Sequence, residues 1–274
     1  MKMHVLDLGT LTLDENLMVA GTNIASASIP NKPNARTRIP VSSYCIEHAE
    51  GNVLFDTGCN PNAMGPEGRW SEFLQDLCPH AGGEECELPN RLAQIGLRPD
   101  DIRFAVLSHL HNDHAGCVEF FKKSKIIVHA CEFDAALRTF GLRDQHTPYV
   151  SNDIATWTKT NLDWHLVDTD EKILSLLPGI DILNLGPGHA KGMLGLKVQS
   201  GELGSVILAS DAIYGQQNFG PPAQLAGVAY DPINAARTVE WIRNLAIRTS
   251  SQVWFGHDPV QFASLRKSTE GHYE

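Results

Sequence analysis

A cluster of histidines directly after an apolar run constrains this chain more than any other feature. The residues "IRFAVLSH" at 102–109 predict a buried strand, and the cluster begins at the end of it. Its members are His109, His111, Asp113 and His114. Alternate residues of a chain that leaves a strand point the same way, so the first two can face one ion and the last two another. Imidazole and carboxylate together are ligands that suit zinc.

Three further candidate ligands each follow an apolar strand pattern elsewhere in the chain. They are His189 in "NLGPGH", Asp211 in "VILASD" and His257 in "VWFGHD". Strand ends that converge on one edge of a sheet commonly form a site. One zinc ion takes three or four protein ligands, so seven candidates suit two ions. The expected sets are His109, His111 and His189 for one ion, Asp113, His114 and His257 for the other, and Asp211 as a bridge.

The order of the other patterns predicts a layered α/β fold. Strand patterns cover 3–13, 38–48, 52–58, 102–109 and 125–130, five short segments between 163 and 211, and 252–258. Helical patterns cover 88–97, 131–140 and 231–249, and "AGCVEFF" after the cluster has the composition of a first helical turn. Strands in runs with helices between the groups indicate two sheets with helices outside. No linker interrupts the pattern, so residues 1–274 are expected to form one domain.

Charge and composition exclude several classes of function. The chain carries 22 Lys and Arg against 32 Asp and Glu, a net charge of −10, which argues against a nucleic-acid partner. No apolar run approaches the roughly 20 residues of a membrane helix, and no signal peptide is recognisable, so a cytoplasmic location without membrane contact is expected. The six cysteines form no C-x-x-C pair, which favours structural thiols.

The motif "HLHNDHAG" resembles the metal-binding motif H-x-H-x-D-H of the metallo-β-lactamase superfamily. The similarity extends over nearly the whole chain through "LFDTG", "PGH", "SDAIY" and "GHD". It implies a four-layer αβ/βα sandwich with the metal site at one edge of two sheets. Within the superfamily the chain is most similar to the quorum-quenching N-acyl homoserine lactonases, with which it shares "SHLHxDHAG", "DAxY" and "FGHD". That branch implies two Zn²⁺ ions, a small lactone opened by a metal-bound hydroxide, and allows a homodimer.

The same resemblance gives roles to three more side chains and shows one departure. It implies that Asp113 also shuttles a proton and that the Tyr214 hydroxyl hydrogen-bonds the substrate carbonyl or the departing oxygen. Asp56, in "DTG", is expected to accept a hydrogen bond from a ligand histidine. Met193 occupies a position where the family commonly has a histidine, in a region expected to line the site.

Long connections without a clear pattern leave the substrate open. They cover 14–38, 59–88 and 141–160, and connections of this length are often functional, so we expect them to shape the pocket. The alternative substrate is another small ring: a γ-butyrolactone, a pyridoxolactone-type aromatic lactone, or a benzoxazolinone-type carbamate or lactam, in catabolism or detoxification. A metal-stabilised binding protein without catalysis is the alternative from another class, and a turnover test separates the two. No motif of a serine hydrolase or a P-loop occurs.

Overall fold

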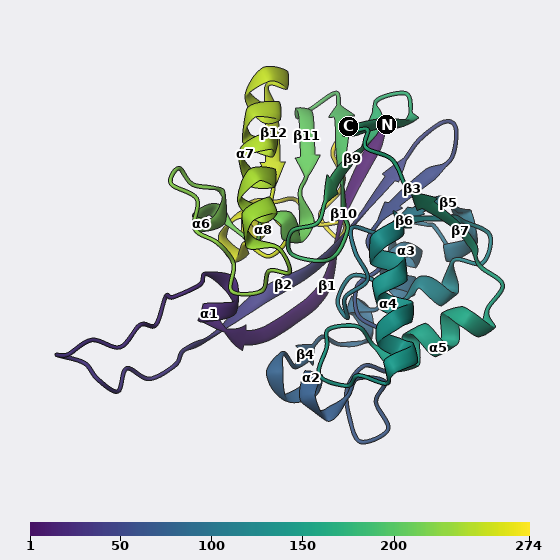
Figure 1. Cartoon of the computed structure of the whole chain (residues 1–274). Coiled ribbons are helices and arrows are strands. Elements are labelled where there is room, and N and C mark those ends of the chain that lie inside the picture. The colour runs from purple at the N-terminus through teal and green to yellow at the C-terminus, as the bar shows by residue number, and fades with distance from the viewer.

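Two β-sheets form the centre of the computed structural model, which describes residues 1–274 (Figure 1). The first sheet has seven strands in the order β4-β1-β2-β3-β5-β6-β7. They are β1 (Lys2–Asp14), β2 (Arg36–Glu47), β3 (Asn52–Phe55), β4 (His80–Ala81), β5 (Ile102–Val106), β6 (Lys125–His129) and β7 (Asp163–Val167). The second sheet has the order β12-β11-β10-β9-β8. Its strands are β8 (Ile173–Leu177), β9 (Ile180–Gly186), β10 (Met193–Ser200), β11 (Gly204–Leu208) and β12 (Ser251–Trp254).

Helices cover the outer face of each sheet, as Figure 1 shows for α4 and α7. They are α1 (Glu15–Met18), α2 (Glu72–Leu77), α3 (Leu88–Gln94), α4 (Ala130–Leu142), α5 (Ser151–Lys159), α6 (Gln216–Phe219), α7 (Pro232–Thr249) and α8 (Pro259–Ser264). The largest apolar cluster joins α3, α4 and α5 to the first sheet, and a smaller one joins α7 to the second. A third cluster fills the space between the sheets. The predicted four-layer αβ/βα sandwich is therefore confirmed.

The alternation of side chains along each strand explains how the second sheet contributes to two apolar clusters. Side chains of a strand alternate between its two faces. In β10, Leu194, Leu196 and Val198 pack toward the first sheet. The opposite face of the second sheet, which includes Met193, packs against the apolar side of α7. Helix α7 is the helix predicted over 231–249, and it begins with Asp231 as N-cap and Pro232 in the first turn.

The segment after the histidine cluster does not form the predicted helix. It consists of turns and a short 3-10 helix at Val118–Phe120. Side chains of the loop after β3 take carbonyls that a helix would need, since Thr57 Oγ1 donates to His114 O and Asn60 Nδ2 to Gly116 O. A Cβ atom at Gly116 would collide with the backbone of Asn60, so the chain passes too close for a regular helix to form.

The long connections contain more structure than the sequence predicts. Residues 14–38 include α1, residues 59–88 include α2 and β4, and residues 141–160 include α5. Helix α5 is anchored by buried Ile154 and Trp157. Between α1 and β2 the chain projects from the body as a long arm (Figure 1).

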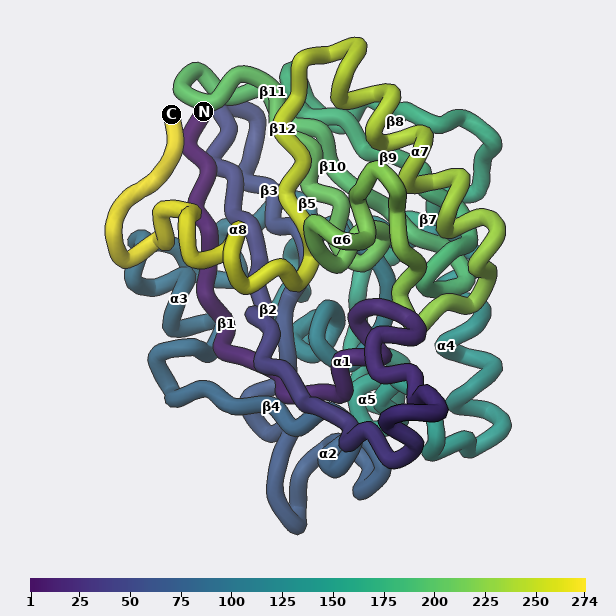
Figure 2. The backbone as a smooth tube through the Cα atoms, turned by 90° about the vertical axis from the view of Figure 1, so that its left-hand side faces the viewer, coloured from purple at the N-terminus to yellow at the C-terminus, as the bar shows by residue number.

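The two ends of the chain lie at the same end of the molecule (Figure 2). Met3 and Tyr273 exchange backbone hydrogen bonds of 2.8 and 2.9 Å, which ties the C-terminal residues to β1. None of the helices combines the length and the apolar composition that a bilayer span requires.

Candidate metal centre

All seven predicted ligands meet at one edge of the two sheets. His109, His111, Asp113 and His114 lie in the loop after β5 of the first sheet. His189, Asp211 and His257 follow β9, β11 and β12 of the second sheet. Each of the seven is at most 6% exposed. A backbone hydrogen bond of 2.8 Å from Leu194 N to Ser108 O joins the sheets next to the cluster.

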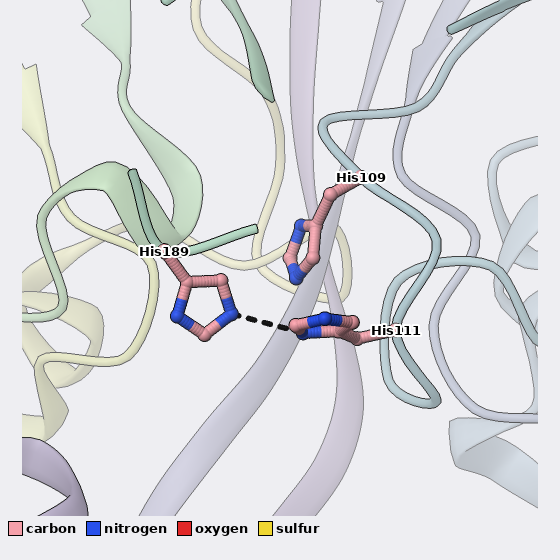
Figure 3. Close-up of side chains that lie close together, drawn as sticks. All are labelled: His109, His111 and His189. Atoms are coloured by element: carbon pink, nitrogen blue, oxygen red, sulfur yellow. Dashed lines mark hydrogen bonds between the residues drawn. The ribbon is translucent and has the colours of Figure 1, made fainter. Parts of the chain in front are cut away.

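Three histidines form the first candidate metal position (Figure 3). The ligand atoms of His109, His111 and His189 lie within 4.8 Å of one another. His189 Nε2 and His111 Nδ1 point toward each other at 2.9 Å, although they come from different sheets. This set is the one that the sequence predicts for the first ion.

The second candidate position lies beside the first, and Asp211 stands between them. Asp113, His114 and His257 form its ligand group, within the same 4.8 Å. Asp211 Oδ1 lies 3.0 Å from His257 Nε2 and 3.2 Å from His114 Nε2. Its other oxygen, Oδ2, lies 3.4 Å from His189 Nε2 and 3.8 Å from His109 Nε2. One oxygen thus faces each position, which is the geometry of a bridging carboxylate.

The Nδ1 nitrogens of four histidines each lie within hydrogen-bond distance of an oxygen atom, which leaves the Nε2 nitrogens to face a metal. The Nδ1 partners are Ser108 Oγ at 2.9 Å for His109, Asp56 Oδ2 at 2.9 Å for His114, Val228 O at 3.1 Å for His189 and Pro40 O at 2.8 Å for His257. A ring that donates from Nδ1 keeps a lone pair on Nε2. The Nε2 atoms of His109 and His114 and Oδ1 of Asp211 are buried without a hydrogen-bond partner. Divalent cations fit these unpartnered atoms.

The charges of the cluster also favour cations. Burial, followed by the neighbouring imidazoles, holds the pKa of His109 and of His111 well below the usual value, so both rings are neutral. Burial also acts to lower the pKa of His114 and His257, but the nearby carboxylates outweigh it and raise both. The pKa of Asp211 is held well below its usual range, against burial, by the cationic neighbours His257 and His114. The attraction that retains protons here would equally retain metal ions.

Asp56 occupies the position that the sequence predicts, directly after β3. Its carboxylate accepts from His114 Nδ1 at 2.9 Å, from Ser108 N at 2.7 Å and from Ser108 Oγ at 2.8 Å. Ser210 Oγ lies 3.3 Å from the same carboxylate. The backbone φ of Asp56 is 62°, a conformation that Asp and Asn tolerate better than most residues. Asp56 therefore orients His114 and, through Ser108, the loop after β5 that also carries His109 and His111.

Replacing Asp56 by asparagine is expected to weaken metal binding by about 10- to 100-fold, because His114 Nδ1 loses its carboxylate acceptor. Chelator competition, with the metal content of the dialysed protein as a second measurement, gives the change. Asp163, which pairs with His165 at 3.1 Å on the protein surface, supplies the matched control Asp163→Asn. Equal metal affinity in the two variants would remove Asp56 from this role.

A cavity of about 170 Å³ opens onto the cluster. Its polar side includes Asp113, Asp211 and Tyr214. Its apolar side is formed largely by Leu11, Leu13, Leu17, Ile39, Phe73, Leu74, Leu77, Pro148 and Val228. Each of the three long connections contributes side chains to this wall, as expected. Phe73 and His146 also line the cavity, and no motif around either residue identifies it as a lining residue.

Tyr214 is 6% exposed and lies between the rings of His189 and His257. Its hydroxyl is 3.3 Å from His189 Nδ1, the nitrogen that donates to Val228 O. Burial, with Asp211 as the next cause, raises the pKa of Tyr214 well above its usual value. The hydroxyl therefore stays protonated and faces the cavity as a hydrogen-bond donor.

Met193 does not line the site, contrary to the expectation from the sequence. It is the first residue of β10, is 1% exposed, and packs in the apolar cluster between the second sheet and α7. The strand alternation turns its side chain away from the cavity. The departure from the family pattern at this position is thus a change in core packing.

Comparisons with known proteins agree with this geometry. The model of the metallo-beta-lactamase superfamily matches residues 36–244. The N-acyl homoserine lactonase AiiB of Agrobacterium fabrum is 50% identical over 276 residues, covering 100% of this chain and 99% of the relative. The N-acyl homoserine lactonase AiiA of Bacillus thuringiensis subsp. kurstaki is 30% identical over 266 residues. The match covers 97% of this chain and 96% of the relative. The chain also matches a solved structure of an N-acyl homoserine lactone hydrolase with the product N-hexanoyl-L-homoserine bound at its catalytic metal centre. The TM-score is 0.82 at 28% sequence identity, and the match covers 100% of this chain and 98% of the solved one.

Proposed function

Since this chain belongs to the metallo-beta-lactamase superfamily, we propose that it is a two-metal hydrolase that opens the lactone ring of N-acyl homoserine lactones. The observation that carries the proposal is the pair of adjacent ligand groups joined by Asp211, at the floor of a cavity with an apolar wall. The 50% identity to a lactonase over the whole chain supports the substrate class.

We propose Zn²⁺ as the ion at both positions, because imidazole and carboxylate suit it and because Nε2 of His109, Nε2 of His114 and Oδ1 of Asp211 are buried without a hydrogen-bond partner. His109, His111 and His189 would hold one ion, Asp113, His114 and His257 the other, and Asp211 both. Bound there, divalent ions supply Lewis acidity and lower the pKa of a water molecule, which is the chemistry that ester hydrolysis needs. Asp113, at the cavity surface, is placed to accept a proton from the attacking water and to pass it to the departing oxygen as the ring opens.

The apolar wall is suited to the acyl chain of such a substrate. It lines the same cavity as the ligand side chains, so a substrate whose ring lies at the metals would extend its chain along residues such as Phe73, Leu74 and Pro148. Each methylene buried there contributes about 0.8 kcal/mol. The cavity is smaller than the roughly 300–1,000 Å³ of sites for drug-sized ligands, which favours a small ring with a modest chain.

Replacing Tyr214 by phenylalanine is expected to lower kcat by about 10- to 100-fold while both ions stay bound, because one donor to the developing oxyanion is lost. Elemental analysis and steady-state kinetics on the same preparation test both halves of this expectation. Tyr44, which is buried between the sheets, provides the control Tyr44→Phe. A wild-type rate in Tyr214→Phe would exclude the hydroxyl from the reaction.

The substrate is tested by following acid release with a pH indicator, using zinc-loaded protein. The panel contains N-hexanoyl homoserine lactone, simple γ-lactones, and fused-ring aromatic lactones and carbamates. We expect the acyl homoserine lactone to be hydrolysed fastest. Turnover of the simple or fused rings alone would retain the metal chemistry and assign the protein to catabolism or detoxification. Bound metal without any turnover would favour a binding protein.

A further inference from the structure

A buried carboxylate outside the ligand set connects the two segments that form the three-histidine position. Glu132, in the first turn of α4, is fully buried. Its Oε1 accepts from Leu110 N at 3.0 Å. Its Oε2 accepts from Lys191 N at 3.0 Å and from Gly192 N at 3.3 Å. The side chain thus holds one segment from each side of the metal centre.

The position of these donors in the sequence shows why this connection matters. Leu110 lies between His109 and His111, and Lys191 is two residues after His189. The three histidines come from different sheets, so their mutual distance depends on how these two loops are held. Gly192 allows the close approach, since a Cβ atom there would collide with the ring of His129 at the start of α4.

A second contact links the same carboxylate to a ligand ring. The side chains of Tyr149 and Glu132 lie near enough for each to shift the pKa of the other. The ring of Tyr149 meets the ring of His111 edge to face, with centroids 5.1 Å apart and an interplanar angle of 75°. Glu132 therefore acts on the first metal position through the backbone on both sides and through the packing of His111.

We propose that Glu132 is a positioning residue that sets the spacing of His109, His111 and His189 and so determines metal affinity at that position. The proposal rests on the two metal positions of the proposed function. Loss of the carboxylate would leave three backbone N–H groups without their acceptor, those of Leu110 and Gly192 buried, and the two loops would be free to separate.

The test is Glu132→Gln, measured by chelator competition in the presence of Zn²⁺. The amide can accept from one loop but presents an NH₂ group to the donors of the other. We expect metal affinity at the three-histidine position to fall by about 10- to 100-fold, with the other position unchanged. The variant His189→Ala identifies which binding step belongs to the three histidines. Excess Zn²⁺ should restore occupancy, which a merely structural defect would not allow.

The matched control is Asp153→Asn. Asp153 is also a buried carboxylate, paired with Arg69 at 3.0 Å, and burial raises the pKa of both Asp153 and Glu132 to about 7. It lies on α5 and bonds to neither metal-holding loop. Equal losses of affinity in the two variants, or no loss in Glu132→Gln, would overturn the proposal.

Glu132→Asp keeps the test decisive if Glu132→Gln does not fold. Aspartate retains the charge but is one methylene shorter, so it can hold only one of the two loops. A selective loss at the three-histidine position is again expected, and unchanged affinity would overturn the proposal. Wild-type protein that binds no metal would defeat the proposed function as well. Wild-type protein with two ions but without lactone turnover would defeat the proposed function alone.

Discussion

Replacing Asp211 by alanine is expected to lower the metal content from two ions per chain to one or none, and kcat/KM by about a thousandfold or more. The reason is that Oδ1 faces the group of His114 and His257, while Oδ2 faces that of His109 and His189. No other side chain serves both positions. Stabilisation by a bound metal amounts to several kcal/mol, and each 1.36 kcal/mol corresponds to a factor of ten in rate.

Elemental analysis after dialysis and lactone turnover measure the two effects. A suitable control is Asp181→Ala, on β9 of the same sheet, because Asp181 pairs with Lys197 at 2.9 Å away from the metal centre. This control should retain both ions and wild-type turnover. Two bound ions in Asp211→Ala, with more than a tenth of wild-type activity, would contradict the bridging assignment.

Removal of the metals is expected to abolish turnover and to lower the melting temperature by about 10–20 °C. An ion at a free concentration 100 times its Kd stabilises the folded state by about 2.7 kcal/mol, so two contribute about 5 kcal/mol. For a domain of roughly this size, 1 kcal/mol corresponds to about 2–4 °C. The ligands come from both sheets, so the loss affects the packing of one sheet on the other.

Calorimetry with and without a chelator, followed by addition of Zn²⁺, measures this shift and its reversal. Asp211→Ala is the appropriate control, since a protein that holds little metal should respond weakly to the chelator. A melting temperature unaffected by chelation in the wild type would show that the cluster binds no ion tightly in solution.

The sequence was sufficient to predict the ligand cluster because its signals are local. His109 and His111 follow a buried strand at alternate positions, and His189, Asp211 and His257 each follow a strand of their own. Strand ends of two packed sheets meet at an edge, so the convergence of these residues follows from the fold. That they bind metal remains a prediction.

Other parts could not be predicted because they depend on tertiary contacts. The segment "AGCVEFF" has a helical composition, but Thr57 and Asn60 take its carbonyls. Met193 is adjacent to the site in sequence, yet the alternation of β10 directs it into the core. Glu132 occupies an ordinary helical position, and only the approach of two distant loops gives its carboxylate a function.

The candidate metal ligands and the apolar wall come from different parts of the fold. Every ligand lies just after a strand, whereas most of the wall belongs to the long connections, such as α2 with Phe73 and Leu74. Insertions and substitutions in these connections can therefore alter which acyl chain of a substrate fits the cavity. They need not displace a candidate metal ligand. Substrate recognition can therefore change during evolution while the reaction stays the same. Exchange of the 59–88 segment between relatives should change substrate preference without abolishing catalysis.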